Sequence, residues 1–88
     1  MRRIRVILEM QSLLKDAETI YYYHKDAKKA ITLGDRAIAL YEQNVRELEG
    51  VPVAKELYKH ILNFAGNIWL DLKDERFRPY VEKFYELC

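Results

Sequence analysis

Residues 52–72, PVAKELYKHILNFAGNIWLDL, are the most apolar part of the chain and decide its fold class. Apolar residues recur here at spacings of three and four, which is the period of one helix face. That face consists of Ala54, Leu57, Ile61, Phe64 or Ala65, Ile68 and Leu72, and Tyr58, Leu62 and Trp69 widen it. Pro52 suits the first turn of a helix, where its missing backbone N–H leaves no hydrogen bond unmade. The stretch predicts a central helix that is buried over more than half of its circumference.

The rest of the chain also has a helical composition. Of its 88 residues half are apolar and a third are charged, and only three Gly and two Pro interrupt them. The polar residues 73–76 are followed by Pro79, which predicts a short final helix over residues 79–87. We therefore expect an all-α protein, a three- or four-helix bundle with a long N-terminal helix, in which residues 1–88 form a single helical domain.

The N-terminal part of the chain carries the longest periodic pattern. Its apolar positions are Val6, Met10, Leu13, Ala17, Ile20, His24, Ala27 and Ile31. This spacing predicts one helix over residues 3–33, about 45 Å long. Gly34 and Asp35 can serve as a left-handed C-cap and an N-cap, so we expect a break there and a second helix over residues 36–49. The same spacing continues through Gly34, which leaves a continuous helix over residues 3–49 as the alternative.

Composition excludes several classes of protein. Lys and Arg total 15 against 14 Asp and Glu, a balance that argues against a nucleic-acid binder acting through bulk charge. No apolar run approaches the roughly 18 residues of a membrane span, and no targeting segment is evident. The single cysteine, Cys88, permits no intrachain disulfide and no cysteine-based metal site, which fits a cytoplasmic protein. The many Glu, Lys, Arg and Tyr residues resemble the composition of thermophilic proteins.

The two histidines offer the only catalytic candidates, and both have a plainer interpretation. His24 lies on the apolar seam of the first predicted helix, where a core or interface role is expected. The residues from His60 onward resemble a short part of the histidine phosphotransfer motif, but Asn63 and Phe64 stand where that motif has a lysine and then a small residue. No metal-ligand spacing or phosphate loop is present, so we expect no cofactor, no metal and no enzymatic activity.

Three consecutive tyrosines, residues 21–23, are the most unusual feature of the sequence. Successive helical residues point about 100° apart, so one apolar stripe cannot bury all three rings. Exposed tyrosines favour protein contacts because they cover area at low rotamer cost. The predicted interface consists of Tyr21, Tyr22, Tyr23, His24, Met10 and Leu14.

We expect a non-enzymatic protein–protein interaction or assembly module, acting as a homodimer or with a protein partner. The reasoning is that so long a first helix carries more apolar surface than the remaining residues can cover. The alternative is a small nucleic-acid-associated regulator. That function would use Arg2, Arg3 and Arg5 together with Lys25, Lys28 and Lys29.

Overall fold

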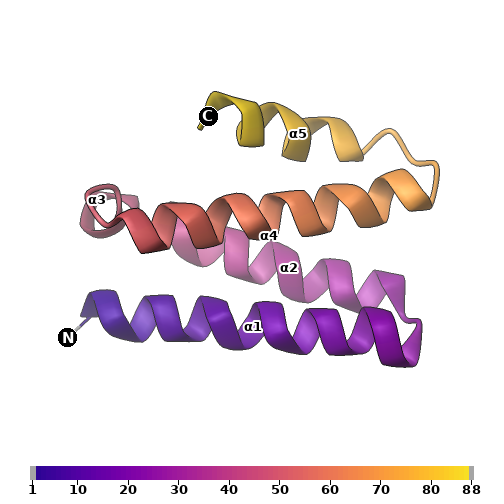
Figure 1. Ribbon diagram of the computed structural model, residues 1–88, viewed down its shortest axis with the longest axis horizontal. Coiled ribbons are helices and arrows are strands. Elements are labelled where there is room, and N and C mark those ends of the chain that lie inside the picture. The colour runs from indigo at the N-terminus through magenta and orange to yellow at the C-terminus, as the bar shows by residue number, and fades with distance from the viewer. Residues whose placement is uncertain (1, 88) are drawn as a thin grey trace.

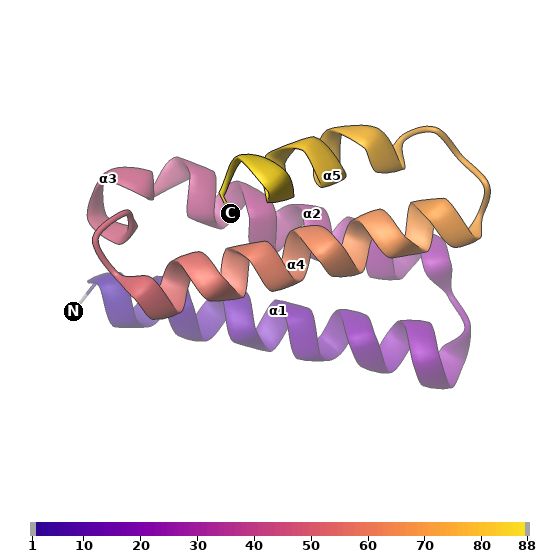
Figure 2. The ribbon, with the colours of Figure 1, turned by 45° about the horizontal axis from the view of Figure 1, so that its top comes forward.

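The computed structural model of the chain describes residues 2–87 and confirms the all-α fold. Its helices are α1 (Arg2–His24), α2 (Ala27–Gln43), the single turn α3 (Val45–Leu48), α4 (Pro52–Asp71) and α5 (Phe77–Glu86). α1, α4 and α5 lie side by side, and α2 runs obliquely from the end of α1 to behind α4 (Figures 1 and 2). Consecutive long helices run antiparallel, so α1 and α4 point the same way. The four long helices form a flat bundle of 37 × 26 × 16 Å.

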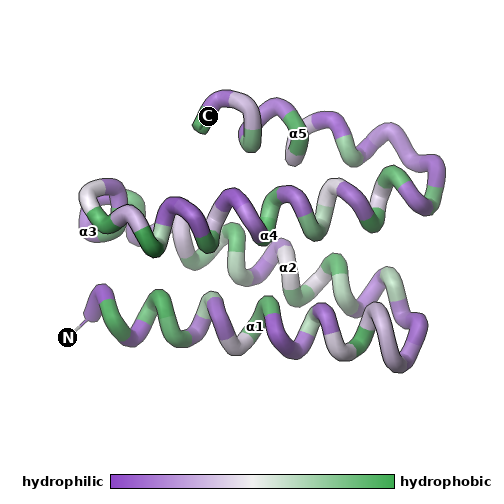
Figure 3. Tube along the Cα trace, in the orientation of Figure 1, coloured by the Kyte–Doolittle hydropathy of each residue, from purple (hydrophilic) through white to green (hydrophobic). Residues whose placement is uncertain are grey.

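The predicted central helix is confirmed. The buried residues of α4 are Ala54, Tyr58, Ile61, Leu62, Phe64, Ala65, Gly66 and Ile68. Leu72, which was expected on this face, is 49% exposed because the helix has already ended at Asp71. The loop from α4 to α5 is mostly hydrophilic, as Figure 3 shows, and Pro79 lies in the first turn of α5. Within residues 2–87, no helix combines the length and the hydropathy that crossing a membrane requires.

The chain reverses at Lys25 and Asp26, which corrects the predicted helix over residues 3–33. Lys25 has a positive φ of 59°, the left-handed conformation that ends a helix. The Asp26 N–H donates to the Ile20 carbonyl (3.2 Å), and the Asp26 Oδ1 accepts from the Lys29 N–H (3.1 Å). Asp26 is therefore the N-cap of α2. Lysine rarely occupies a left-handed position, so residue type gives little warning of this turn.

Gly34 does not break a helix, and the second predicted helix over residues 36–49 is also wrong. Gly34 lies buried inside α2, where its backbone is not left-handed. A Cβ placed on Gly34 would lie 3.7 Å from the Ala65 Cβ, so the glycine marks a close approach of α2 and α4. Ala30 and Ala37, one turn to either side, are fully buried. The continuous helix over residues 3–49 is excluded as well, because the chain turns at Lys25.

The apolar stripe of the first helix is covered by the chain itself, contrary to the expectation that it exceeds what the protein can shelter. Val6, Met10, Leu14 and Ala17 are each less than 9% exposed. The reason is the early reversal, since it packs α2 antiparallel against α1 (Figure 1). Helix length alone therefore gives no argument for a partner.

Polar contacts supplement the packing of α5, which has no fully buried residue. The Tyr80 hydroxyl donates to the Asp35 carboxylate (2.6 Å), and Lys83 Nζ donates to Glu42 Oε2 (2.8 Å). The same Glu42 oxygen accepts from the Tyr58 hydroxyl (2.7 Å), which joins α2, α4 and α5. Burial and the Asp35 hydrogen bond raise the pKa of Tyr80 to about 12.

Replacing Gly34 with alanine tests where the chain turns. Because Gly34 is helical and the new methyl group has ordinary contact room, Gly34→Ala should raise the free energy of unfolding by about 0.5–1 kcal/mol. Denaturant unfolding measures this. Gly66→Ala is the matched comparison and should gain less or lose stability, because its Cβ would lie 3.3 Å from the Tyr80 Cβ. A marked loss on Gly34→Ala would indicate a left-handed cap at this residue.

Acidification should weaken the attachment of α5 through Glu42. Burial would raise the pKa of Glu42, but hydrogen bonds from Lys83 and Tyr58 outweigh it and hold the pKa below its ordinary value of 4.5. The stabilisation is therefore present above pH 4.5 and disappears as the pH falls through the lowered pKa. Glu42→Gln should flatten this part of the curve of unfolding free energy against pH. Glu82→Gln, at an exposed glutamate of α5, is the control. If Glu82→Gln flattens the curve as much as Glu42→Gln does, Glu42 does not have the proposed role in attaching α5.

Candidate functional site

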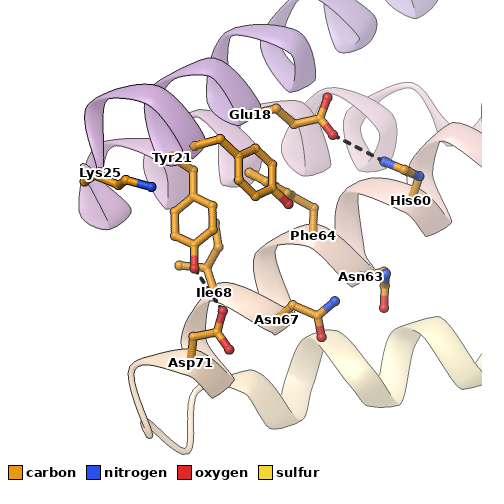
Figure 4. A pocket seen from close by; sticks show the side chains of 10 residues that line it. Glu18, Tyr21, Lys25, His60, Asn63, Phe64, Asn67, Ile68 and Asp71 are labelled. Carbon is orange, nitrogen blue, oxygen red and sulfur yellow. Dashed lines mark hydrogen bonds and ion pairs between the residues drawn. The ribbon is translucent and has the colours of Figure 1, made fainter.

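A groove of about 640 Å³ lies between the C-terminal halves of α1 and α4 (Figure 4). We call it the α1/α4 groove. It is lined by Glu18, Tyr21, Tyr22, Lys25, His60, Asn63, Phe64, Asn67, Ile68 and Asp71. These residues follow helical spacings of three and four on both helices, so each helix presents one edge to the groove.

The groove exists because α1 packs mainly on α2 and contacts α4 only lightly. The two helices run parallel and are furthest apart near their C-terminal ends, in the view of Figure 1. The side chains of Tyr21, Tyr22 and Phe64 are among those that line this space. The turn at Lys25 closes one end.

Three aromatic rings form the floor of the groove. The Tyr21 ring lies edge-on to the Phe64 ring, with centroids 6.0 Å apart and planes at 88°. Tyr22 contacts both, at centroid distances of 5.1 Å to Tyr21 and 6.5 Å to Phe64. Phe64 is only 7% exposed, whereas Tyr22 is 56% exposed. Edge-to-face pairs of this kind stabilise a ring cluster beyond its area burial, so the floor is preorganised.

Polar and charged groups surround this floor. The Tyr21 hydroxyl donates to Asp71 Oδ2 (2.9 Å), and that hydrogen bond, with burial, raises the pKa of Tyr21. His60 Nε2 lies 3.7 Å from Glu18 Oε2, and both side chains are largely accessible (59% and 40% exposed). Asn63 and Asn67 stand one turn apart on α4.

The groove offers hydrogen-bonding and charged groups that can bind a ligand. Each asparagine amide can donate and accept, and Lys25 adds a cation at the end of the groove. A ligand that combines an apolar group with hydrogen-bonding groups fits an aromatic floor inside a polar rim. Among residues 2–87, no three His, Cys, Asp or Glu side chains are placed to hold a metal ion.

The residues of the predicted interface are not gathered on one surface. Tyr21 and Tyr22 line the groove, while Tyr23 (82% exposed) and His24 project to solvent at the end of α1. Met10 and Leu14 belong to the chain's own core, at 0% and 8% exposure. His24 therefore lies outside the core.

The residues of the nucleic-acid alternative are also separated. Arg2, Arg3 and Arg5 begin α1, whereas Lys25, Lys28 and Lys29 follow its end. A helix of 23 residues spans about 34 Å, so the two sets lie at opposite ends of α1. Cys88 lies outside the described residues.

Sequence reasoning did not identify Asn63, Phe64, Asn67 or Asp71 as parts of one site. Their spacing with His60 places them along one edge of α4. This spacing was the only feature of the sequence that could have grouped them into one site. Which edge meets α1 depends on the reversal at Lys25, which the apolar pattern does not reveal.

Comparison with known proteins finds no matching family model, no similar curated protein and no similar solved structure.

The tyrosine–aspartate contact across the groove can be tested by titration. Because a hydrogen bond to a carboxylate favours the protonated phenol, Asp71→Asn should move the pKa of Tyr21 down towards 10. Ultraviolet phenolate absorbance measures this, with Tyr21→Phe identifying the residue. Asp16→Asn, at an exposed aspartate of α1, is the control. A Tyr21 titration that Asp71→Asn leaves unchanged would contradict the contact.

Proposed function

We propose that the protein is a non-enzymatic protein–protein interaction or assembly module of the cytoplasm, acting with a protein partner or a second copy of itself. The observation that carries this proposal is the α1/α4 groove, an accessible aromatic floor framed by hydrogen-bonding side chains. Aromatic residues at the centre and polar residues at the rim are the usual anatomy of a protein-binding surface.

A segment of a partner protein matches the groove in chemistry. An apolar side chain of the segment would rest on the exposed Tyr22 ring, and its backbone amides would bond to Asn63 and Asn67. A lysine or arginine near this anchor would meet the carboxylate of Glu18 or Asp71.

Neither alternative activity gains support from the geometry. The two basic sets do not combine into one surface for a nucleic-acid backbone, and Asp26 lies among the second set. Phosphotransfer at His60 would bring a phosphoryl group beside the Glu18 carboxylate, 3.7 Å from the imidazole, where like charges repel.

Selection from a random-peptide display library tests the proposal. Immobilised protein should enrich peptides that combine an aromatic or aliphatic anchor with a basic residue. Asn67→Arg should weaken binding of those peptides at least tenfold, because a long cation one turn before Asp71 would pair with it and cover the floor.

The matched control is Gln43→Arg, which adds the same side chain at an exposed amide of α2, away from the groove. It should leave peptide binding unchanged. The groove would be overturned as the binding site if no peptide is enriched. It would also be overturned if the enriched peptides bind the Asn67→Arg variant with the same affinity as the original protein.

A further inference from the structure

A second hollow, of about 440 Å³, lies at the end of the bundle opposite the turn at Lys25. Its lining comes from the ends of α2 and α5, from α3 and the residue after it, and from the first two turns of α4. Figure 2 shows α3 and the start of α4 at this end, with the C-terminal end of α5 directed toward it. We call this hollow the Tyr41 pocket. Among the described residues, none lines both it and the α1/α4 groove.

Part of the lining of the Tyr41 pocket is apolar. The Tyr41 and Tyr58 rings stack, with centroids 4.0 Å apart and planes at 9°, and both residues are only 5% exposed. Val45, at 40% exposure, and Leu87 extend this apolar part. Because the two rings are stacked and buried, they hold their part of the pocket in place before any ligand arrives.

The Tyr41 hydroxyl is a polar group without a partner. It forms no hydrogen bond with any other residue of the described range 2–87, whereas the Tyr58 hydroxyl beside it donates to Glu42 (2.7 Å). Burial and the negative charge of Glu49 raise the pKa of Tyr41, so its hydroxyl lies within reach of that charge. A buried tyrosine hydroxyl usually has a hydrogen-bond partner, and this one is free to bond with an occupant of the pocket.

Opposite charges line the pocket without pairing. Glu42 is already engaged, since its Oε2 accepts from Lys83 Nζ (2.8 Å). Glu49 and Lys55 also line the pocket, but within residues 2–87 they form no ion pair with each other or with any other residue. A carboxylate and an ammonium that lie apart in one hollow complement a ligand that carries both charges itself.

We propose that the Tyr41 pocket binds a small zwitterion with an apolar group, that is, an apolar amino acid. The ligand's ammonium donates to the Glu49 carboxylate and to the Tyr41 hydroxyl oxygen, and its carboxylate accepts from Lys55 Nζ. Its side chain rests on Val45 and Leu87. The volume of about 440 Å³ lies within the usual range of small-molecule sites. This site goes beyond the proposed protein-binding function, which belongs to the α1/α4 groove.

The same two charges discriminate against ligands with a single charge. A simple amine would gain from Glu49 but would be repelled by Lys55, and a simple carboxylate would meet the reverse situation. An uncharged apolar ligand would leave both groups, and the Tyr41 hydroxyl, without partners. Selectivity for the zwitterion is therefore the property that separates this site from an apolar hollow.

An NMR titration of the full ¹⁵N-labelled chain with L-leucine tests the proposal. The amide signals of the pocket residues should shift and saturate, with a dissociation constant of about 1 mM or a few mM, as is usual for so small a ligand. Two analogues each lack one charge: 4-methylpentanoate has no ammonium, and isopentylamine has no carboxylate. Each should bind about fivefold more weakly than L-leucine, or weaker still.

Two substitutions assign the charges to their residues. Glu49→Gln should weaken L-leucine about fivefold without weakening 4-methylpentanoate, which has no ammonium to lose. Lys55→Gln should weaken L-leucine about fivefold without weakening isopentylamine. A variant that merely disturbs the fold would weaken all three ligands. Glu9→Gln and Lys15→Gln, at exposed charges of α1, are the matched controls and should change none of the affinities.

A third substitution tests the hydroxyl. Tyr41→Phe keeps the stacked ring and removes only the oxygen, so it should weaken L-leucine and isopentylamine while it leaves 4-methylpentanoate unchanged. Tyr23→Phe, at the exposed end of α1, is the control.

The proposal is overturned if L-leucine causes no saturable shifts at about 50 mM, or if the shifting signals lie outside the pocket. It is also overturned if the two single-charge analogues bind as tightly as L-leucine. Asn67→Arg, which should block peptide binding in the α1/α4 groove, should leave L-leucine binding unchanged, because Asn67 does not line the Tyr41 pocket. Failure of one site therefore leaves the other intact.

Discussion

The reversal at Lys25 and Asp26 is the constraint on which the rest of the structure depends. It holds Lys25 in a left-handed conformation, which costs about 1–2 kcal/mol for a residue with a Cβ. The side-chain cap that Asp26 provides for α2 offsets about 1 kcal/mol of that cost. The larger compensation is burial, because the turn brings the apolar faces of α1 and α2 against each other.

Once that hairpin forms, the remaining contacts have few alternatives. The small residues Ala30, Gly34 and Ala37 make α2 narrow enough for α4 to approach, with Ala65 at the contact point. α1 and α4 both pack mainly on other helices, and they contact each other only lightly. The α1/α4 groove is the space that remains beside their aromatic contact. The same arrangement leaves one side of α1 without any helix against it.

The fold class and the C-terminal half could be predicted from the sequence, because strong local signals agree there. The three–four spacing from Ala54 to Ile68 and the prolines at positions 52 and 79 place α4 and α5 within a few residues of their observed bounds. The long N-terminal helix was also predicted, but the helix bounds in this half were wrong because the apolar spacing passes through the turn without a change of phase. Gly34 was taken for a helix end, although it serves close helix packing, while the true left-handed residue is a lysine.

The candidate site could be predicted only in part for the same reason. The run Tyr21–Tyr22–Tyr23 cannot be buried together, and that alone marks this end of α1 as unusual. Nothing in the sequence distinguishes Phe64, Asn67 and Asp71 from other residues of an amphipathic helix. Their role in the groove becomes apparent only when the position of α1 is known. Met10 and Leu14 were assigned to an interface on the assumption of an uncovered helix, and the hairpin removes that assumption.

The most direct test of this account is a distance between the start of α1 and the end of α3. Spin labels at Arg3→Cys and Arg46→Cys, in a Cys88→Ser background diluted with unlabelled protein, report that distance within one chain. The account predicts a short distance, because Arg2 and Glu47 lie within 3.9 Å of each other. A turn at Gly34 would separate the labels by about 30 Å and a continuous helix by about 65 Å, and either value would contradict the reversal at Lys25.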